Sequence, residues 1–169
     1  MQCMSDPDSA AVFRFRRADL GDLESIVCFN LRLAEETEEK TLDRETLRAG
    51  VSRGMRLFPE AQYFVAEIEG SVIGQLMLTR EWSDWRNGWM LWLQSVYVQR
   101  EFRCQAVFSR LLSCALDTAN ADGKAVGLRL YVEQKNAVAN EAYRKMGFDD
   151  AGYRILEMVP LSCDSKTNT

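Results

Sequence analysis

The chain has 169 residues, of which 47% are hydrophobic and 27% are charged, a composition typical of a soluble globular protein. This length is enough to bury a real core, and we expect one domain across residues 1–169 with its core at about residues 12–159. The net charge of -4 gives no electrostatic basis for binding nucleic acid or an anionic membrane, and no apolar run has the length of a membrane span.

The cysteine and histidine content argues against a metal site. The five cysteines form no CxxC pair, their number is odd, and the chain has no histidine. We therefore expect no zinc site and predict reduced thiols in a cytoplasmic protein. The N-terminus shows no signal-peptide pattern, and we expect residues 1–10 and 162–169 to be flexible.

The N-terminal third predicts a strand followed by two helices. Residues 12–17 alternate apolar and basic side chains, as a half-exposed strand does. Asp19 is a suitable N-cap for a helix that ends in the acidic run 35–39. That run is either a solvated polar end or a rim that attracts a cationic amine. A second helix is predicted from Asp43, with Leu47 and Val51 facing inward.

The middle of the chain predicts two hairpins. Strands are expected at residues 63–69 and 72–79, joined by a turn at Gly70-Ser71, and Asn87-Gly88 predicts a second hairpin. The four tryptophans of the chain surround this second turn: Trp82, Trp85, Trp89 and Trp92. They form either ordinary core and hairpin packing, or an aromatic wall of an acceptor pocket, or a dimer surface. Glu81 and Asp84 beside these rings would suit a cation.

The stretch 91–112 organises the rest of the chain. Residues 91–98 are apolar and uncharged, which predicts a buried strand. After a polar turn with Arg100 and Arg103, a helix is predicted whose buried stripe is Phe108, Leu111, Leu112, Ala115, Leu116 and Ala119. Free N–H groups at the start of this helix could hold a phosphate, although an ordinary strand-to-helix connection would have the same sequence pattern.

The C-terminal third predicts a strand at residues 126–132, a helix that Asn136 caps and Gly147 ends, and a last strand at residues 153–159. The predicted order is β-α-α-β-β-β-α-β-α-β. This order gives an α/β fold (an α+β mixed sheet), with a central, mostly antiparallel sheet flanked by helices.

Two segments carry a resemblance to a known family. Val98-x4-Arg103-Cys104-Gln105-Ala106-Val107-Phe108 resembles the coenzyme A pyrophosphate loop of the GNAT N-acetyltransferase superfamily, R-x-x-G-x-G/A. Ala106 and Phe108 stand where that pattern has glycine, and glycine or alanine. The segment Asn136-x-x-Ala139-x-x-x-Tyr143-x-x-x-Gly147-Phe148 resembles the family's second signature. The resemblance covers residues 12–159 and implies the GNAT-like fold.

The resemblance implies an enzyme that moves an acetyl group from acetyl-CoA to a primary amine of a small molecule or peptide, by direct attack and without a metal. The resemblance is also compatible with a homodimer. The alternative is a non-catalytic module that binds acyl-CoA through a degraded pyrophosphate loop. A third interpretation is an interaction domain that uses the tryptophan hairpin as its surface.

The resemblance also implies roles for individual residues. Backbone N–H groups of the segment Val96, Tyr97 and Val98 are expected to stabilise the thioester oxygen. The pyrophosphate is expected at Arg103 and at the N–H groups of Cys104, Gln105, Ala106, Val107 and Phe108. Asn136 is expected to approach the pantetheine arm. Tyr143 is expected to hydrogen-bond the leaving thiolate, unless its ring only fills a helix–sheet interface. A left-handed Ala106 would cost about 1 kcal/mol relative to glycine.

The acceptor side depends on carboxylates, because without histidine the general base must be a carboxylate or water. The candidates are Glu36, Glu38, Glu81 and Asp84, of which Glu36 and Glu81 are preferred. The acceptor is expected to contact Glu36, Glu38, Trp82 and Trp85.

Overall fold

The computed structural model describes residues 12–134 and 136–159, so the ends predicted to be flexible lie outside the described residues. The chain divides into two compact units that meet in sequence between Tyr131 and Val132, and each is described by itself. Within the described part of the chain, no helix combines the length and the apolar character that crossing a bilayer requires.

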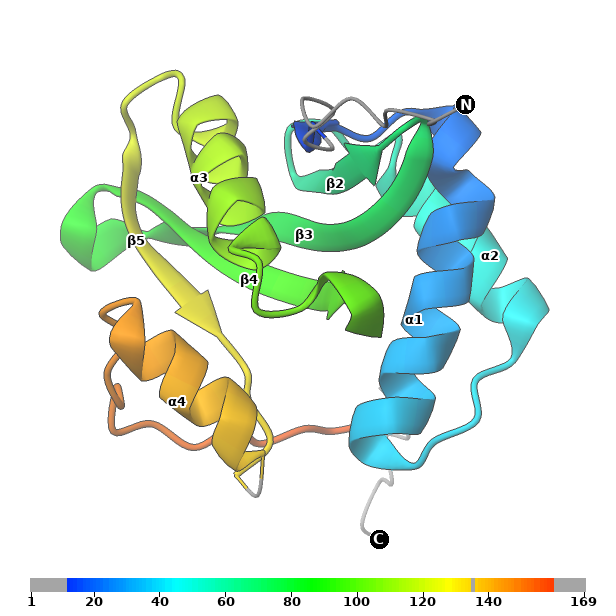
Figure 1. Ribbon diagram of the computed structural model, residues 1–169. Helices are drawn as coiled ribbons and strands as arrows, with labels where there is room; N and C mark the ends of the chain where they lie inside the picture. Colours follow the sequence, from blue (N-terminus) through cyan, green and yellow to red (C-terminus); the bar gives the residue numbers. More distant parts are fainter. Residues whose placement is uncertain (1–11, 135, 160–169) are drawn as a thin grey trace, which may run out of the picture. The chain divides into compact units, whose positions relative to one another are not determined.

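A five-stranded sheet in the order β1-β2-β3-β4-β5 forms the centre of the first unit (Figure 1). Neighbouring strands are antiparallel from β1 to β4, whereas β5 runs parallel to β4. The prediction of a mixed, mostly antiparallel sheet is therefore confirmed. The strands are β1 (Arg14–Arg17), β2 (Ala61–Ile68), β3 (Ser71–Ser83), β4 (Gly88–Val98) and β5 (Ala125–Leu130).

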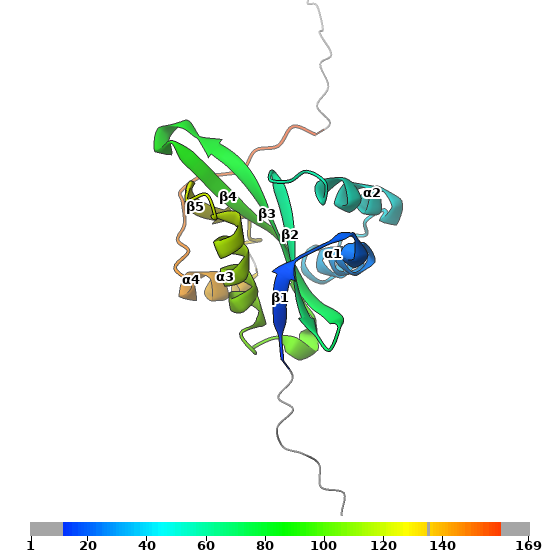
Figure 2. The same cartoon turned by 90° about the horizontal axis from the view of Figure 1, so that it is seen from above.

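Helices cover both faces of this sheet. Figure 2 shows α1 (Leu23–Glu38) and α2 (Arg44–Gly54) on one side and α3 (Val107–Ala119) on the other. Because side chains alternate along a strand, β2 contributes to two apolar layers. One layer joins the first two helices to the sheet through Ile26, Val27, Val51, Tyr63 and Val65.

The start of α1 follows from two aspartates. The Asp19 carboxylate accepts from the N–H of Gly21 (2.7 Å), and the Asp22 carboxylate accepts from the N–H of Asp19 (2.9 Å), which closes a capping box over a short 3-10 turn. Asp22 also accepts two hydrogen bonds from Arg16. Burial alone would raise the pKa of Asp22, but these hydrogen bonds hold it below its ordinary value.

The buried stripe of α3 differs by one residue from its predicted start. Val107, Leu111, Leu112, Ala115 and Ala119 are buried, whereas Phe108 and Leu116, which were also predicted to be buried, are only half-buried. The reason is that the helix begins at Val107, directly after a left-handed Ala106. Val107 therefore takes the inward position that periodicity alone gave to Phe108.

Both predicted hairpins are present, with different turn residues. Glu69 and Gly70 have positive φ and form the first turn, one residue earlier than predicted. The second hairpin turns through a 3-10 turn at Asp84–Arg86 and a left-handed Asn87. None of the four tryptophans is buried, so core packing is wrong for them, whereas hairpin packing is present, because Trp82 and Trp89 pair across the two strands. The tryptophans lie outside the core because β2 pairs with β3 only as far as Thr79, so the tip of the hairpin extends past β2, while β5 still pairs with β4 as far as Trp89.

The second unit contains α4 (Ala137–Lys145). As predicted, Asn136 caps this helix by accepting from the N–H of Ala139 (3.0 Å), and Gly147 follows its end with a φ of 89°. The predicted last strand at Tyr153–Val159 is wrong, because none of the described residues after α4 forms a strand. A strand needs a neighbour for its backbone hydrogen bonds, and this stretch pairs with none of the described strands. The observed order is therefore β-α-α-β-β-β-α-β-α.

Candidate active site

The centre of the candidate site is a bulge in β4 just beyond its last pair with β5. The parallel pairing of β4 and β5 ends at Leu93. Two residues later Ser95 has a φ of 50°. The register with β3 shifts here, because Met77 pairs with Gln94 while Gln75 pairs with Tyr97. Two residues of β4 thus oppose one of β3, which bends the strand and increases its twist. From this point β4 continues without β5 but remains paired with β3.

The backbone direction beyond the bulge follows from two hydrogen bonds. The N–H of Gln99 donates to the Ile73 carbonyl of β3 (2.9 Å). Because residues alternate in direction along a strand, the polar groups of Val98 point away from β3. The Val98 carbonyl indeed accepts from Nε of Arg103 (2.8 Å) on that side. From the same alternation we infer that the N–H of Tyr97 points to β3 and that of Val96 to the open edge.

The turn between β4 and α3 has the geometry of an anion site. Cys104 and Ala106 both have positive φ, at 61° and 58°. Left-handed residues in such a turn direct successive N–H groups to one side, as in anion-binding nests. The turn opens directly into α3, which has no acidic residue in its first turn. The N–H of Arg110 donates to the Ala106 carbonyl (3.1 Å), as expected for the fourth helical residue. The backbone here fits a phosphate group.

Ala106 occupies the conformation that glycine would adopt most easily. Its φ of 58° and ψ of 13° lie in the left-handed region. An alanine there costs about 1 kcal/mol relative to glycine. The loop therefore keeps the backbone shape that the glycine pattern predicts, although its sequence departs from that pattern.

Arg103 joins the turn to α1. Its guanidinium donates through Nε to the Val98 carbonyl (2.8 Å) and through a terminal nitrogen to Oε2 of Glu36 (3.0 Å). The second oxygen of Glu36 accepts from the Tyr97 hydroxyl (3.0 Å). The Arg103 guanidinium also lies 5.5 Å from the centre of the Tyr97 ring. Arg103 therefore acts in this structure as a clamp between strand, turn and helix.

These contacts set the protonation of Glu36 and Tyr97. Partial burial would raise the pKa of Glu36, but hydrogen bonds from Arg103 and Tyr97 outweigh it and hold the pKa below the ordinary value. Burial raises the pKa of Tyr97, and its hydrogen bond to Glu36 raises it further. Glu36 is thus a firmly ionised carboxylate, with both oxygens occupied.

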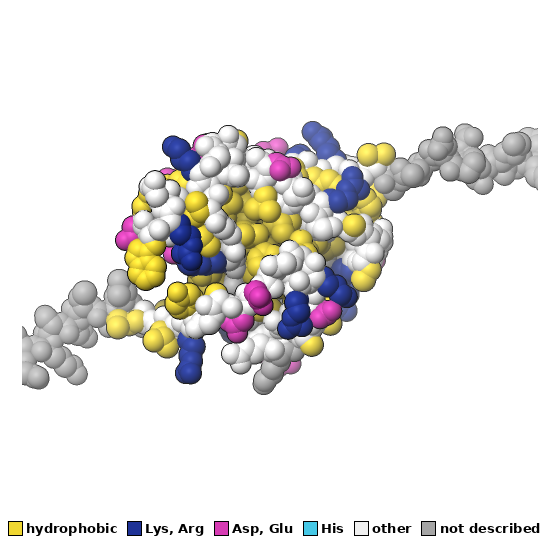
Figure 3. Space-filling model, turned by 90° about the vertical axis from the view of Figure 1, so that its left-hand side faces the viewer, with side chains coloured by type: hydrophobic (Ala, Val, Ile, Leu, Met, Phe, Trp, Pro, Cys, Tyr) yellow, Lys and Arg dark blue, Asp and Glu magenta, His cyan; other side chains and the backbone are white. Residues whose placement is uncertain are grey.

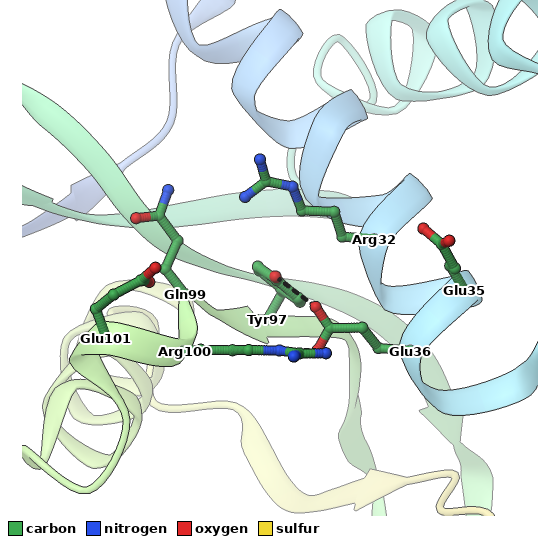
Figure 4. A pocket seen from close by; sticks show the side chains of 7 residues that line it. All are labelled: Arg32, Glu35, Glu36, Tyr97, Gln99, Arg100 and Glu101. Carbon is green, nitrogen blue, oxygen red and sulfur yellow. Dashed lines mark hydrogen bonds and ion pairs between the residues drawn. The ribbon is translucent and has the colours of Figure 1, made fainter.

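A pocket of about 450 Å³ lies beside this cluster (Figure 4). Its lining comes from α1, from the end of β4 and from the short turn Arg100–Phe102: Arg32, Glu35, Glu36, Tyr97, Gln99, Arg100 and Glu101. Nε of Arg100 lies 3.4 Å from Oε2 of Glu36. Glu35 makes no hydrogen bond or ion pair within residues 12–134 and 136–159, so its carboxylate is open to a ligand.

Sequence reasoning found part of this lining. It singled out Glu36, Tyr97 and the acidic run 35–39, but it assigned no role to Arg32, Gln99 or Glu101. One signal was available, because residues three and four apart share a face of a helix. That spacing places Arg32, Glu35 and Glu36 on one side of α1.

The other predicted acceptor residues lie elsewhere in the first unit. Both oxygens of Glu81 are held, one by the Trp92 indole and one by Arg129 (3.0 Å). Glu81 pairs with Met90, which lies seven residues before Tyr97, or about 20 Å along the strand. Glu81 and Glu36 are therefore not brought together.

Trp82 and Trp85, the two tryptophans predicted to contact the acceptor, lie at the tip of the β3–β4 hairpin. Trp82 meets Trp89 edge to face at 5.0 Å, and Trp85 is 87% exposed. Figure 3 views the molecule from the side on which this tip lies, and apolar side chains are exposed on that face. Glu38 pairs with Lys40 and does not line the pocket. Of the four predicted acceptor residues, only Glu36 lines it.

The second unit carries Tyr143 and Asn136. Tyr143 is half-buried and meets Phe148 edge to face at 5.6 Å. Burial raises the pKa of its phenol. The Asn136 side-chain oxygen is used in capping α4. Among the described residues of both units, no group of three or more metal-binding side chains comes together.

Comparison with known proteins agrees with this geometry. Residues 26–148 match the acetyltransferase (GNAT) family. A possible acetyltransferase from Clostridium difficile 630 is 38% identical, with a TM-score of 0.79 over 87% of this chain and 97% of the other. A predicted acetyltransferase with acetyl-CoA from Clostridium acetobutylicum is 17% identical (TM-score 0.71, 86% and 96% covered). Glucosamine-6-phosphate N-acetyltransferase from Arabidopsis thaliana is 16% identical (TM-score 0.65, 88% and 99% covered). No curated protein matches in sequence. The chain belongs to the acetyltransferase (GNAT) family.

Proposed function

We propose that this protein transfers an acetyl group from acetyl-CoA to a primary amine of a small molecule or peptide, by direct attack of the amine on the thioester. The observation that carries the proposal is one continuous backbone path. It begins at the outward N–H of Val96, passes the left-handed turn at Cys104 and Ala106, and ends at the start of α3. Such a path offers donors to a thioester at one end and to a pyrophosphate at the other.

Family membership supports the acetyl donor, and one fold relative is described with acetyl-CoA. The amine acceptor has weaker support, from a fold relative named as an N-acetyltransferase of glucosamine-6-phosphate. In the proposed site the N–H of Val96 donates to the thioester oxygen as negative charge develops there. An aimed backbone donor of this kind contributes on the order of 3 kcal/mol. The N–H groups from Cys104 to Phe108 hold the pyrophosphate.

The acceptor amine is proposed to enter the pocket beside Glu35. An alkyl amine has a pKa of about 10.4, so it arrives as a cation, and an open carboxylate attracts it. The amine must then lose a proton. The lowered pKa of Glu36 makes it a weaker base than an ordinary carboxylate, and Glu81 is held by two partners. We therefore propose that water carries the proton away, while Glu36 keeps Arg103 in place.

Tyr143 is proposed to hydrogen-bond the sulfur as the thiolate leaves. Burial raises its pKa, so the phenol stays protonated at neutral pH and can donate. Asn136 is proposed to approach the pantetheine arm with groups other than its capping oxygen, because that oxygen is already bonded to Ala139.

A second candidate function is a module that binds acyl-CoA without turnover. Two observations favour it. Both carboxylates preferred as the general base are already paired, and the loop carries the cost of a left-handed alanine. Turnover separates the two candidates, because a binding module would retain its affinity for acetyl-CoA and release no thiol.

The experiment is a thiol-release assay with acetyl-CoA and a panel of primary amines, including amino sugars, polyamines and peptides with a free N-terminus. The enzyme interpretation expects amine-dependent release of coenzyme A for at least one class. Tight binding of acetyl-CoA without release for any class would favour the binding module. The reagent that detects the thiol of released coenzyme A also reacts with free cysteine thiols, so those of Cys28, Cys104 and Cys114 must be titrated first. They also support the proposed cytoplasmic location.

A further inference from the structure

A buried glutamine lies against the β4 bulge. Gln75 of β3 has 0% exposure, and its Nε2 donates to the Ser95 carbonyl (3.2 Å) at the bulge. The same nitrogen donates to Oδ1 of Asn30 (2.9 Å), which lies on α1 and is 8% exposed. A polar connection therefore runs from α1 through β3 to the bulge, inside an otherwise apolar layer.

Stability alone does not account for this glutamine. Its Oε1 is buried and has no hydrogen-bond partner among the described residues. A buried polar atom without a partner destabilises a fold, and an apolar side chain of similar volume would avoid that loss. What Gln75 provides in return must therefore be sought in what its nitrogen holds.

The Ser95 carbonyl and the Val96 N–H belong to the same peptide unit. A trans peptide is planar, and its C=O and N–H point in opposite directions. Holding the carbonyl toward the Gln75 side chain therefore directs the Val96 N–H to the opposite side, away from that side chain. Ser95 is left-handed, with a φ of 50°, which a residue with a side chain rarely adopts without support.

We infer that Gln75, oriented by Asn30, is a positioning residue that fixes the Ser95–Val96 peptide plane and so aims the Val96 N–H at the thioester oxygen. The catalytic part of this inference rests on the proposed function, because the aim of that donor matters only if a thioester reacts there. The structural part, the orientation of one peptide plane, stands without it.

The test replaces both polar partners at once, in the variant Gln75→Met with Asn30→Leu, so that no buried polar group is left alone. The matched control is Gln62→Met. Gln62 is a second buried glutamine whose Oε1 also has no partner among the described residues, but its nitrogen donates to Pro59, away from the bulge. The wild type, the double variant and the control are compared by the amide NMR signals of Ser95 to Tyr97, by melting temperature and by thiol release.

The double variant should keep or raise the melting temperature, shift or broaden the Val96 amide signal, and lower kcat about ten- to hundredfold with little change in the KM for acetyl-CoA. The control should leave the Val96 signal and kcat unchanged. If the double variant does not fold, Gln75→Met alone takes its place.

An unchanged Val96 signal together with unchanged kcat would overturn the inference, and so would an equal loss of kcat in Gln62→Met. If the wild-type protein itself releases no thiol with any amine, the proposed function fails. The amide signals of the protein without ligand then still decide whether Gln75 sets the peptide plane.

Discussion

Arg103 of the proposed phosphate turn is bound to Glu36 of α1, with a guanidinium nitrogen 3.0 Å from Oε2. The turn is thus braced by the helix that also lines the proposed acceptor pocket, and the two halves of the proposed site share one ion pair. Any change that moves this end of α1 should therefore alter the affinity for acetyl-CoA, and the first prediction follows from that connection.

Replacing Glu36 with glutamine should weaken acetyl-CoA binding without abolishing it. The amide cannot pair with the Arg103 charge, so the clamp loosens while the backbone donors remain. We expect the Kd to rise about tenfold, or roughly 1.4 kcal/mol, in a calorimetric titration. An unchanged Kd would show that the turn holds its shape without Arg103. Glu24→Gln is a suitable control, because Glu24 is also paired with two arginines but far along α1 from the turn.

The same variant should alter the pH dependence of stability. The folded-state pKa of Glu36 lies below its ordinary value of 4.5, so the ionised clamp contributes stability that is fully present above that pH. This contribution is lost as the pH falls through the lower, folded-state pKa. Urea unfolding should therefore give a larger difference between wild type and Glu36→Gln at about pH 7 than at about pH 3. A difference that does not change with pH would contradict the assignment.

Ala106→Gly should stabilise the protein, because glycine adopts the left-handed conformation without strain. The gain is at most about 1 kcal/mol, reduced by the greater entropy of glycine in the unfolded chain. Acetyl-CoA binding should be kept or tightened. The control is Ala49→Gly on an exposed helical position of α2, which should destabilise by about 1 kcal/mol. Loss of stability in both variants would mean that Ala106 is not left-handed in solution.

Glu35→Gln should raise the KM for the amine acceptor several-fold with little effect on acetyl-CoA, because it removes the open carboxylate of the pocket. Glu38→Gln is the matched control, since Glu38 lies on the same turn of α1 but does not line the pocket. Steady-state kinetics in both substrates separates the two effects. An equal change in both variants would indicate a general charge effect of the acidic run.

Tyr143→Phe should lower kcat about ten- to a thousandfold while leaving acetyl-CoA affinity nearly intact. Because burial raises the pKa of Tyr143, the wild-type rate should not fall through ionisation of this phenol below about pH 10. Tyr153→Phe, at an exposed tyrosine of the same unit, should behave as wild type. Turnover that is unaffected by Tyr143→Phe would remove this residue from the mechanism.

Much of the fold was predictable because it depends on local signals. Asp19, Asp43 and Asn136 were predicted as caps and are caps in the structure, and the apolar stretch at 91–98 forms most of the buried strand β4. The last strand was not predictable in this way. Residues 153–159 have a strand-like composition, but a strand exists only where a partner accepts its hydrogen bonds.

For the candidate site, the sequence pointed to the backbone turn at residues 103–108 and to the acidic end of α1, but not to the side-chain contacts that join them. The left-handed turn at Ala106 could be inferred from a glycine pattern that this sequence only partly keeps. The pairing of Arg103 with Glu36 joins residues 67 positions apart, and no spacing rule connects them. The role of Gln75 depends on a register shift that only the folded sheet shows.

Thermal melting with and without acetyl-CoA tests the central claim most directly, with ATP and NADH as control nucleotides. One-site binding at a hundredfold excess over Kd adds about 2.7 kcal/mol, which raises the melting temperature by several degrees. Ala106→Asp is the matched variant, because aspartate tolerates the left-handed region and is a good N-cap, yet its charge would repel a pyrophosphate at the start of α3. We predict a shift for wild type with acetyl-CoA alone and none for Ala106→Asp. The absence of a shift for wild type at millimolar acetyl-CoA, or an equal shift in both proteins, would contradict the account.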